Sequence, residues 1–440
     1  MALPPGPKIP AVVQTLELSV RPFTLLRRCA EHFGDPFTIK IVGNRIYVIV
    51  SDPATIREIF AGLNGIDPIG IGNDELRPAL GDHSLLLLDG AEHKRHRKVL
   101  APPFSSNSVP AYRDLIHRIT ERLSSGWQQG ATIPIYDAMQ EIALEVILSI
   151  VFGTNMGSRL EEFKTGVSNF MHCVSGPVGY FPALQKDLGP WSPGGKVLRT
   201  KRELDKLIFD EITRRRQAQN GKGNGVISAL LNAGEVGEEP FSDQEIHDEL
   251  ITLILAGHDP TTAALAWAMY WIHQDLSIAK KLREEMSETA PDRPEDWAYL
   301  DAIVNETLRI HPMFPTVERK MRVPVEIMGY VIDPGVRITP CVYLMHHRPE
   351  LFPEPERFRP ERFLERRYAP YEFFPFGGGS RRCIGAHFAH YQMKVILSSL
   401  LRRYSFEALN EGKVRAVLRG ASIGPSGPVR MRVAATPSAN

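Results

Sequence analysis

The sequence has little of what marks secreted, membrane-spanning or nucleic-acid-binding proteins. Its four cysteines are far apart and form no CxxC pair, which excludes a dense disulfide framework and favours a reducing compartment. Its 52 lysines and arginines nearly balance its 51 aspartates and glutamates, so net charge gives no argument for nucleic acid as a partner. No apolar run approaches the roughly 18 residues that a membrane-spanning helix needs.

The N-terminal residues MALPPGPKIP also lack the basic and apolar segments of a secretory signal. We therefore expect a soluble, cytoplasmic protein without a membrane anchor. A chain of 440 residues buries enough surface to fold without disulfide bonds. No internal repeat, low-complexity segment or shift in composition divides the chain, so we expect a single domain over residues 1–440.

Helical patterns dominate the sequence, and the expected fold class is mainly α with a small β-rich lobe. Two β-runs joined at Gly43-Asn44 predict a hairpin, and β-like alternation returns at 321–340 and 413–433. The stretch 175–195, rich in glycine, proline and aromatic residues, predicts a loop. Helices are expected near 21–33, 53–61, 91–101, 109–126, 137–153, 160–172, 197–217, 277–289, 295–310 and 384–402.

The longest helix is expected over about residues 242–275. It begins at Ser242-Asp243-Gln244-Glu245, which has the pattern of a capping box, and at 1.5 Å per residue it spans about 50 Å. Such a helix crosses the whole molecule. Pro260 lies in its middle, where a proline removes a backbone donor and costs roughly 3 kcal/mol. The segment AGHDPTT (256–262) therefore needs an explanation.

The segment FGGGSRRCIGAHFAH (376–390) carries the most chemical information. Glycines before and after Cys383 let backbone N–H groups approach whatever the cysteine holds. A helical pattern follows, and a helix N-terminus favours an anion, so the pattern predicts a thiolate that suits a metal ligand. Other interpretations are a small buried residue, a nucleophile, or half of a zinc site with His387. The zinc interpretation lacks a second Cys/His pair at suitable spacing.

The loop FGGGSRRCIG resembles the haem-binding loop of the cytochrome P450 family. Three further motifs occur in the family's order. Glu306-Thr307-Leu308-Arg309 is similar to its E-x-x-R helix, Pro360-Glu361-Arg362-Phe363 to its PERF segment, and AGHDPTT to its oxygen-activating helix segment. The similarity runs from LPPGP near the N-terminus to RGASIGP near the C-terminus, so it covers nearly the whole chain.

The resemblance implies haem b as the cofactor, with Cys383 as its axial thiolate. The haem loop would be residues 376–385, including Phe376, Gly377 and Gly385. Cationic partners are implied for the two haem propionates, namely His93, Arg97, Arg319 and Arg381. His93 and Arg97 lie four apart on one helical face. The alternative for the basic run at 94–98 is a solvated surface, to which we assign Lys94, Arg95 and Lys98.

Glu306 and Arg309 lie three apart and share a helix face, which alone would indicate a surface ion pair of little energetic value. The resemblance implies instead a buried network of Glu306, Arg309 and Arg362 that holds the haem loop. Its role would be structural, not catalytic.

In the family, the acid of the oxygen-activating segment is usually followed by a threonine, which opens a groove for water that relays protons. Here Asp259 is present, but Pro260 takes the threonine position. In one interpretation Pro260 frees the Ala256 carbonyl, so the groove survives without the hydroxyl. In another, a local bulge rotates Thr261 into the role. In the third, Pro260 merely occupies a kink.

The resemblance places a substrate over the haem face opposite Cys383. The loop 63–81 and the 170–190 region would form part of the wall, and the near absence of large aromatics in 63–81 suggests a roomy pocket. Candidate wall residues are nearly all apolar, which suits a hydrophobic substrate: Leu253, Ala256, Gly257, Met313, Phe314, Pro315, Val317, Ala421, Ser422 and Ile423.

We therefore expect a monomeric haem-thiolate monooxygenase that inserts one oxygen atom from O2 into a fatty acid, terpenoid, steroid or macrolide. The chain carries no flavin or iron–sulfur segment, so electrons are expected from a separate ferredoxin and ferredoxin reductase. A basic patch would steer that carrier, formed by Arg95, Lys98, Arg382, Lys394, Arg402 and Arg403. Alternatives are a peroxide-using, coupling or rearranging haem-thiolate enzyme, and a haem ligand binder without turnover.

Overall fold

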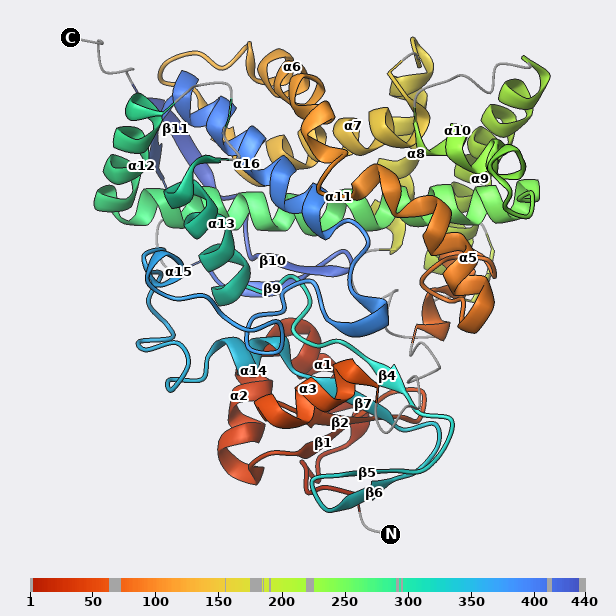
Figure 1. Cartoon of the computed structure of the whole chain (residues 1–440), viewed down its shortest axis with the longest axis vertical. Helices are drawn as coiled ribbons and strands as arrows, with labels where there is room; N and C mark the ends of the chain where they lie inside the picture. The colour runs from red at the N-terminus through yellow and green to blue at the C-terminus, as the bar shows by residue number, and fades with distance from the viewer. Residues whose placement is uncertain are drawn as a thin grey trace.

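The computed structural model describes most of the chain. The described residues are 3–62, 73–154, 156–174, 184, 186–189, 191–218, 225–289, 293, 296–409 and 414–434. Figure 1 shows a helical layer crossed by one long helix, above a smaller lobe that contains the N-terminus and most of the sheet.

The smaller lobe is built from two parts of the chain that are far apart in sequence. A four-stranded sheet has the order β1-β2-β7-β4, in which β2 and β7 are parallel and the other neighbours antiparallel. Asn44 and Gly43 both have positive φ at the β1–β2 turn, as a tight hairpin requires. The lobe comprises α1 (Ala11–Val20), α2 (Pro22–Phe33), β1 (Phe37–Ile41), β2 (Arg45–Val50), α3 (Pro53–Ala61), β4 (Arg319–Lys320), the pair β5 (Val325–Ile327) and β6 (Tyr330–Ile332), β7 (Arg337–Pro340) and α14 (Val342–His346).

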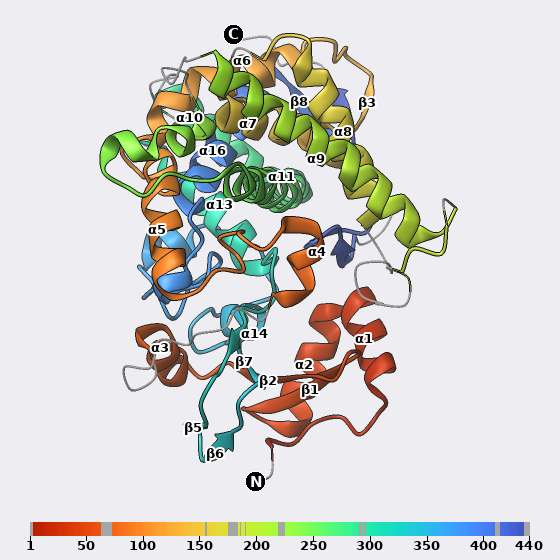
Figure 2. The ribbon, with the colours of Figure 1, turned by 90° about the vertical axis from the view of Figure 1, so that its right-hand side faces the viewer.

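The helical layer surrounds α11 (Asp243–Gln274), which crosses the molecule in Figure 1 and is seen end-on in Figure 2. Most of its residues are buried, and α7 packs along it. The other helices are α4 (Arg77–Leu80), α5 (Gly90–Leu100), α6 (Arg113–Ser124), α7 (Ile135–Phe152), α8 (Arg159–Val174), α9 (Pro193–Gln217), α10 (Val226–Leu231), α12 (Leu276–Glu288), α13 (Ala298–Ile310), α15 (Arg362–Glu365) and α16 (Ala386–Arg403).

Two further sheets belong to the helical side of the molecule. One has the order β3-β11-β8, and the other is the hairpin β9–β10, which contacts α11. Their strands are β3 (Thr132–Pro134), β8 (Ser405–Ala408), β9 (Ala416–Arg419), β10 (Ser422–Pro425) and β11 (Arg430–Ala434). Short 3-10 turns are η2 (Asp74–Leu76), η3 (Pro102–Phe104), η4 (Val109–Tyr112), η7 (Ala233–Val236) and η9 (Gly379–Arg381).

The predicted fold class, mainly α with a small β-rich lobe, is confirmed. The capping box at the start of α11 is present, since Glu245 N–H donates to Ser242 Oγ at 3.2 Å and Ser242 N–H donates to Glu245 at 2.8 Å. Sequence reasoning missed the short helices α1, α4, α10, α14 and α15, of which α4 lies within the stretch 63–81 that was predicted as a loop. Residues 63–72 of the predicted pocket loop, and most of 175–190, lie outside the described residues.

Candidate active site

The Cys383 loop is closed by its own backbone. Cys383 N–H donates to Phe376 O at 2.9 Å, and Gly377 N–H donates to Phe374 O at 2.9 Å. Gly377 and Gly379 have φ near +67°, a conformation that favours glycine. At Gly378, an added Cβ would lie 2.3 Å from the Phe60 ring of α3. Close packing of α3 therefore explains this glycine, a reason the sequence did not reveal.

Cys383 differs from the buried residues Cys29 and Cys341 because its side chain is exposed. Protein atoms nevertheless surround the thiol closely enough that desolvation raises its pKa, while the Gly385 N–H and the Arg382 and Arg97 guanidinium groups act in the opposite direction. The predicted thiolate is thus favoured by these donors and disfavoured by desolvation, and a bound cation would hold the thiolate form.

Cationic side chains from three segments meet the Cys383 loop. Arg97 of α5 donates to Arg382 O at 2.8 Å, and buried Arg319 of β4 donates to Gly378 O at 2.9 Å. Arg381 forms an ion pair with Asp89 at 2.5 Å. His93 is buried one turn before Arg97 on α5. Arg97 and Arg319 thus contact the backbone of the loop that contains Arg381, and the role of these side chains toward haem propionates stays a prediction.

The predicted network around Glu306 is buried and compact. Arg309 donates to both carboxylate oxygens, at 2.7 and 2.8 Å, and Arg362 Nε donates to Glu306 Oε1 at 3.1 Å. The three side chains are at most 2% exposed. The Arg359 N–H also donates to Glu306 at 2.8 Å. The network therefore fastens α13 to α15 and to the segment before it.

His346, which sequence reasoning missed, connects this network to the cysteine loop. Arg309 donates to His346 O at 2.9 Å, and His346 Nε2 accepts the Phe374 N–H at 3.0 Å. Complete burial and the nearby Arg309 charge lower the pKa of His346 well below its usual value. A neutral ring leaves Nε2 able to accept. The link from Arg309 through His346 reaches Phe374, whose carbonyl holds Gly377.

The middle of α11 borders open space on one side. Ala256 is exposed and Gly257 and Pro260 are half-buried, within a helix whose neighbouring residues are buried. A Cβ at Gly257 would lie 2.7 Å from Ile147 of α7. The helix is α-helical through residues 243–274, so of the interpretations of Pro260 the one with a local bulge that rotates Thr261 is not supported. Thr261 is buried, and its hydroxyl donates to Gly257 O at 3.3 Å.

The Asp259 carboxyl is buried and hydrogen-bonded to the C-terminal hairpin. The side chain is 5% exposed, and its Oδ2 accepts the Ser422 hydroxyl at 2.8 Å and the Ala421 N–H at 3.2 Å. Burial raises the pKa of Asp259, while His258 and the β10 donors lower it. The acid is therefore held by the β9–β10 hairpin.

The candidate wall residues divide by exposure. Ile423 N–H donates to Met313 O at 2.8 Å, which joins the hairpin to the segment after α13. Val317 lies beside the cysteine loop, 3.4 Å from where a Gly377 Cβ would be. Ala256, Phe314 and Ala421 are exposed, Gly257, Pro315 and Val317 are half-buried, and Leu253, Met313, Ser422 and Ile423 are buried.

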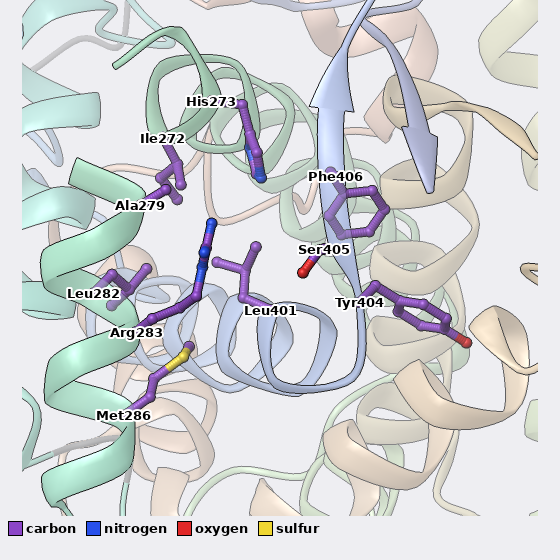
Figure 3. Close-up of a pocket in the computed structure, with 10 residues that line it drawn as sticks. All are labelled: Ile272, His273, Ala279, Leu282, Arg283, Met286, Leu401, Tyr404, Ser405 and Phe406. Atoms are coloured by element: carbon purple, nitrogen blue, oxygen red, sulfur yellow. The ribbon is translucent and has the colours of Figure 1, made fainter. Parts of the chain in front are cut away.

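The pocket in Figure 3 is separate from these residues. It lies between α11, α12, α16 and β8, beside His273, Arg283 and Phe406. Its volume of about 10 Å³ holds at most one water molecule, so it is not a substrate site.

The predicted basic patch is largely neutralised. Arg95 pairs with Glu245, Lys98 pairs with Glu238, and buried Lys394 pairs with Asp301. Lys98 is exposed although it is paired, and Arg382, Arg402 and Arg403 are exposed as well.

The residues fit a haem. An exposed cysteine, cationic side chains around its loop, and a small-residue face of α11 together suit an iron macrocycle that carries two carboxylates. Among the described residues, no group of three or more His, Cys, Asp and Glu side chains could hold a metal ion. Fold and site thus define a haem-thiolate protein.

Comparisons with known proteins identify the family. The sequence model described as Cytochrome P450 matches residues 3–429. Cytochrome P450 135B1 of Mycobacterium tuberculosis is 33% identical over 438 residues, covering 99% of this chain and 92% of the relative. Cytochrome P450 135A1 of the same species is 32% identical over 421 residues, covering 93% and 90%. The chain belongs to the cytochrome P450 family.

A solved structure shares the fold. The retinoic acid bound cyanobacterial CYP120A1 has a TM-score of 0.85 at 22% identity, covering 98% of this chain and 99% of that one. The protein is a monooxygenase that uses protoporphyrin IX haem with a cysteine thiolate ligand, together with a substrate, O2 and redox partners. None of the helices in the described part of the chain is long and apolar enough to span a membrane.

Proposed function

We propose that this protein inserts one oxygen atom from O2 into a hydrophobic small molecule of the fatty acid, terpenoid, steroid or macrolide class. The observation that carries the proposal is that three apolar residues of the proposed substrate wall, Ala256, Phe314 and Ala421, are exposed although they belong to three separate segments. Shape and apolar contact, rather than ion pairing, would hold such a substrate. CYP120A1, which shares the fold, was solved with retinoic acid bound, and this favours terpenoid acids as first candidates.

We propose the following roles for the site residues. Cys383 binds the haem iron, Phe376, Gly377 and Gly385 shape its loop, and His93, Arg97, Arg319 and Arg381 hold the propionates. Glu306, Arg309 and Arg362 fasten the loop's support. Haem supplies the activation of O2. Asp259 orients or passes protons during the reaction. Pro260 leaves the Ala256 carbonyl without an N–H partner. Thr261 is the α11 hydroxyl whose role is to be tested. We propose that residues 1–440 form a single cytochrome P450 domain.

Electrons are proposed to come from a separate ferredoxin and its reductase, with the protein acting as a cytoplasmic monomer. Arg382, next to Cys383 in sequence, and Arg402 and Arg403 at the end of α16 are the exposed cations available for an acidic carrier. Turnover should then fall as ionic strength rises. Gel filtration tests the monomer.

The decisive experiment is product formation from a lipophilic library with NADPH, reductase, ferredoxin and isotopically labelled O2. Label in the product supports monooxygenation. Product that forms with peroxide but contains no label from O2 indicates a peroxide-using enzyme. Coupled or rearranged product without inserted oxygen indicates a coupling or rearranging haem-thiolate enzyme. Binding spectra without any product favour a haem ligand binder. Cys383→Ser serves as the control that removes the thiolate.

A further inference from the structure

The Asp259 carboxyl lies against the β9–β10 hairpin rather than against another part of α11. The Ser422 hydroxyl and the Ala421 N–H both donate to Asp259 Oδ2, at 2.8 and 3.2 Å. Ser422 is fully buried, so bulk water does not compete for this contact. At Gly420, where φ is +64°, an added Cβ would lie 2.7 Å from Asp259 Oδ1. Both oxygens of the acid are therefore in close contact with the hairpin.

The surroundings of Asp259 contain few charges. His258 of α11 is buried and donates through Nδ1 to Ile254 O at 2.7 Å, and burial lowers its pKa. Tyr136 of α7 is close enough that Asp259 contributes to raising its pKa, after burial. Arg419 of β9 stacks over Tyr136, 3.6 Å from the ring centroid. In the described part of the chain, the hydrogen bonds to the Asp259 carboxyl come from a hydroxyl and backbone amides.

The same hairpin also reaches the proposed substrate wall. Ala421 is exposed, whereas Ile423 N–H donates to Met313 O at 2.8 Å. A segment that contacts both the wall and the acid links the two mechanically. Ser422 follows Asp259 by 163 residues, so the proximity comes from the fold alone.

We propose that Ser422 is a positioning residue for the reaction, because its hydroxyl fixes the orientation of the Asp259 carboxyl on the substrate-facing hairpin. The inference rests on the proposed role of Asp259. Pro260 carries no hydroxyl beside the acid, and Ser422 supplies one from the opposite segment. Without it, the carboxyl would rotate among orientations that deliver protons less well.

The test compares Ser422→Ala, Ser422→Thr and Asp259→Asn in the haem-loaded protein. Ser426→Ala is the matched control, because Ser426 lies on the same hairpin and its Oγ accepts the Arg415 N–H at 3.1 Å. The first readout is the infrared carboxyl band of Asp259, assigned by its loss in Asp259→Asn. The second is product formed per NADPH. We expect Ser422→Ala to shift the band and lower coupling roughly tenfold, the effect of one hydrogen bond to a charged group. Ser422→Thr should retain both.

The outcomes separate this inference from the proposed function. Wild-type coupling in Asp259→Asn would remove the acid from the mechanism and the inference with it. If Asp259→Asn loses coupling but Ser422→Ala keeps wild-type coupling, only the positioning role is overturned, whether or not the band moves. Equal effects in Ser422→Ala and Ser426→Ala would also overturn it, since hairpin folding would then be the cause.

Discussion

Arg309 is the residue at which truncation should cost most. Its guanidinium donates twice to Glu306 and once to His346 O, and both charged side chains are fully buried. Removing one member of a buried charge network typically costs about 3–5 kcal/mol. Arg309→Ala should lower the free energy of unfolding by this amount. It should also lower the ratio of bound haem to protein, because His346 loses its anchor.

Arg357 provides the control for this prediction. Its side chain pairs with Glu354, and the two are 65% and 63% exposed, so Arg357→Ala should change the unfolding free energy by no more than about 0.5 kcal/mol. Urea denaturation and haem absorbance measure both variants. A loss in Arg309→Ala no larger than that in Arg357→Ala would contradict the buried network.

Gly378 tests the contact between the cysteine loop and α3. An alanine there would place its Cβ 2.3 Å from the Phe60 ring. Gly378→Ala should therefore destabilise the protein by about 1–3 kcal/mol, the usual cost of overpacking. Adding Phe60→Ala should recover part of the loss, which thermal unfolding of the single and double variants measures. Gly126→Ala, where an added Cβ meets nothing within 4 Å, is the control, and equal losses in both would disprove the contact.

Residue spacing was informative only where partners are close in sequence. The E-x-x-R spacing placed Glu306 and Arg309 on one helix face, and the glycines around Cys383 predicted a close-packed loop, as the structure shows. The burial of this pair in a network with Arg362 was implied only by the family resemblance. The contributions of Phe60 and His346 could not be predicted. Neither residue lies in a pattern, and each acts through a partner far away in the chain.

At the scale of elements, α11 was predicted within one residue at each end because its capping box and apolar periodicity agree. Its central proline was interpreted as freeing the Ala256 carbonyl, as accompanying a local bulge, or as occupying a kink. The structure keeps regular α-helix there, since α7 packs against Gly257 and the hairpin holds Asp259. Tertiary contacts of this kind outweigh a local propensity.

His247 joins α9 to α11 and makes this contact sensitive to pH. It bonds Asp205 of α9 at 3.0 Å and Asp248 at 2.8 Å. Burial alone would lower the pKa of His247, but the two carboxylates together raise it, whereas the pKa values of both aspartates are lowered. Because the pKa of His247 is raised in the folded protein, its contribution to the free energy of unfolding is complete below about pH 6.5. That contribution is lost as pH rises through the folded-state pKa of His247.

The aspartates act at the other end of the range. The contribution of Asp205 and Asp248 to the free energy of unfolding is present above about pH 3.8. It is lost as pH falls through their lowered folded-state pKa values. Stability from this cluster should therefore be greatest between roughly pH 4 and 6.5. Urea unfolding from pH 4 to 9 should show the decline above this window in the wild type but not in His247→Gln. His32→Gln, at an exposed position, should retain it, and parallel curves for all three proteins would contradict the prediction.

At the scale of the molecule, the site is assembled from segments that no sequence pattern connects. Cys383 precedes α16, Arg97 comes from α5, Arg319 from β4 and Ala256 from α11. The parallel pairing of β2 with β7 brings β4 into the N-terminal sheet and so sets where Arg319 lies. Only the resemblance to a family predicted that these residues meet.

This assembly predicts what removal of haem should do. A ligand bound at about 1,000 times its dissociation constant stabilises the folded state by about 4.1 kcal/mol, and here it would contact all four segments. The haem-free protein should therefore unfold more easily than the loaded one. Amide exchange should rise in α5, β4 and the loop of residues 374–385. The β1–β2 turn at Gly43-Asn44 is the internal control, because its hydrogen bonds are local to the hairpin, and its exchange should change little. Equal increases in the turn and the loop would show that haem acts on global unfolding alone. Increases in α5, β4 and the loop without an increase in the turn would show that haem, once bound, holds the separate parts of the site together.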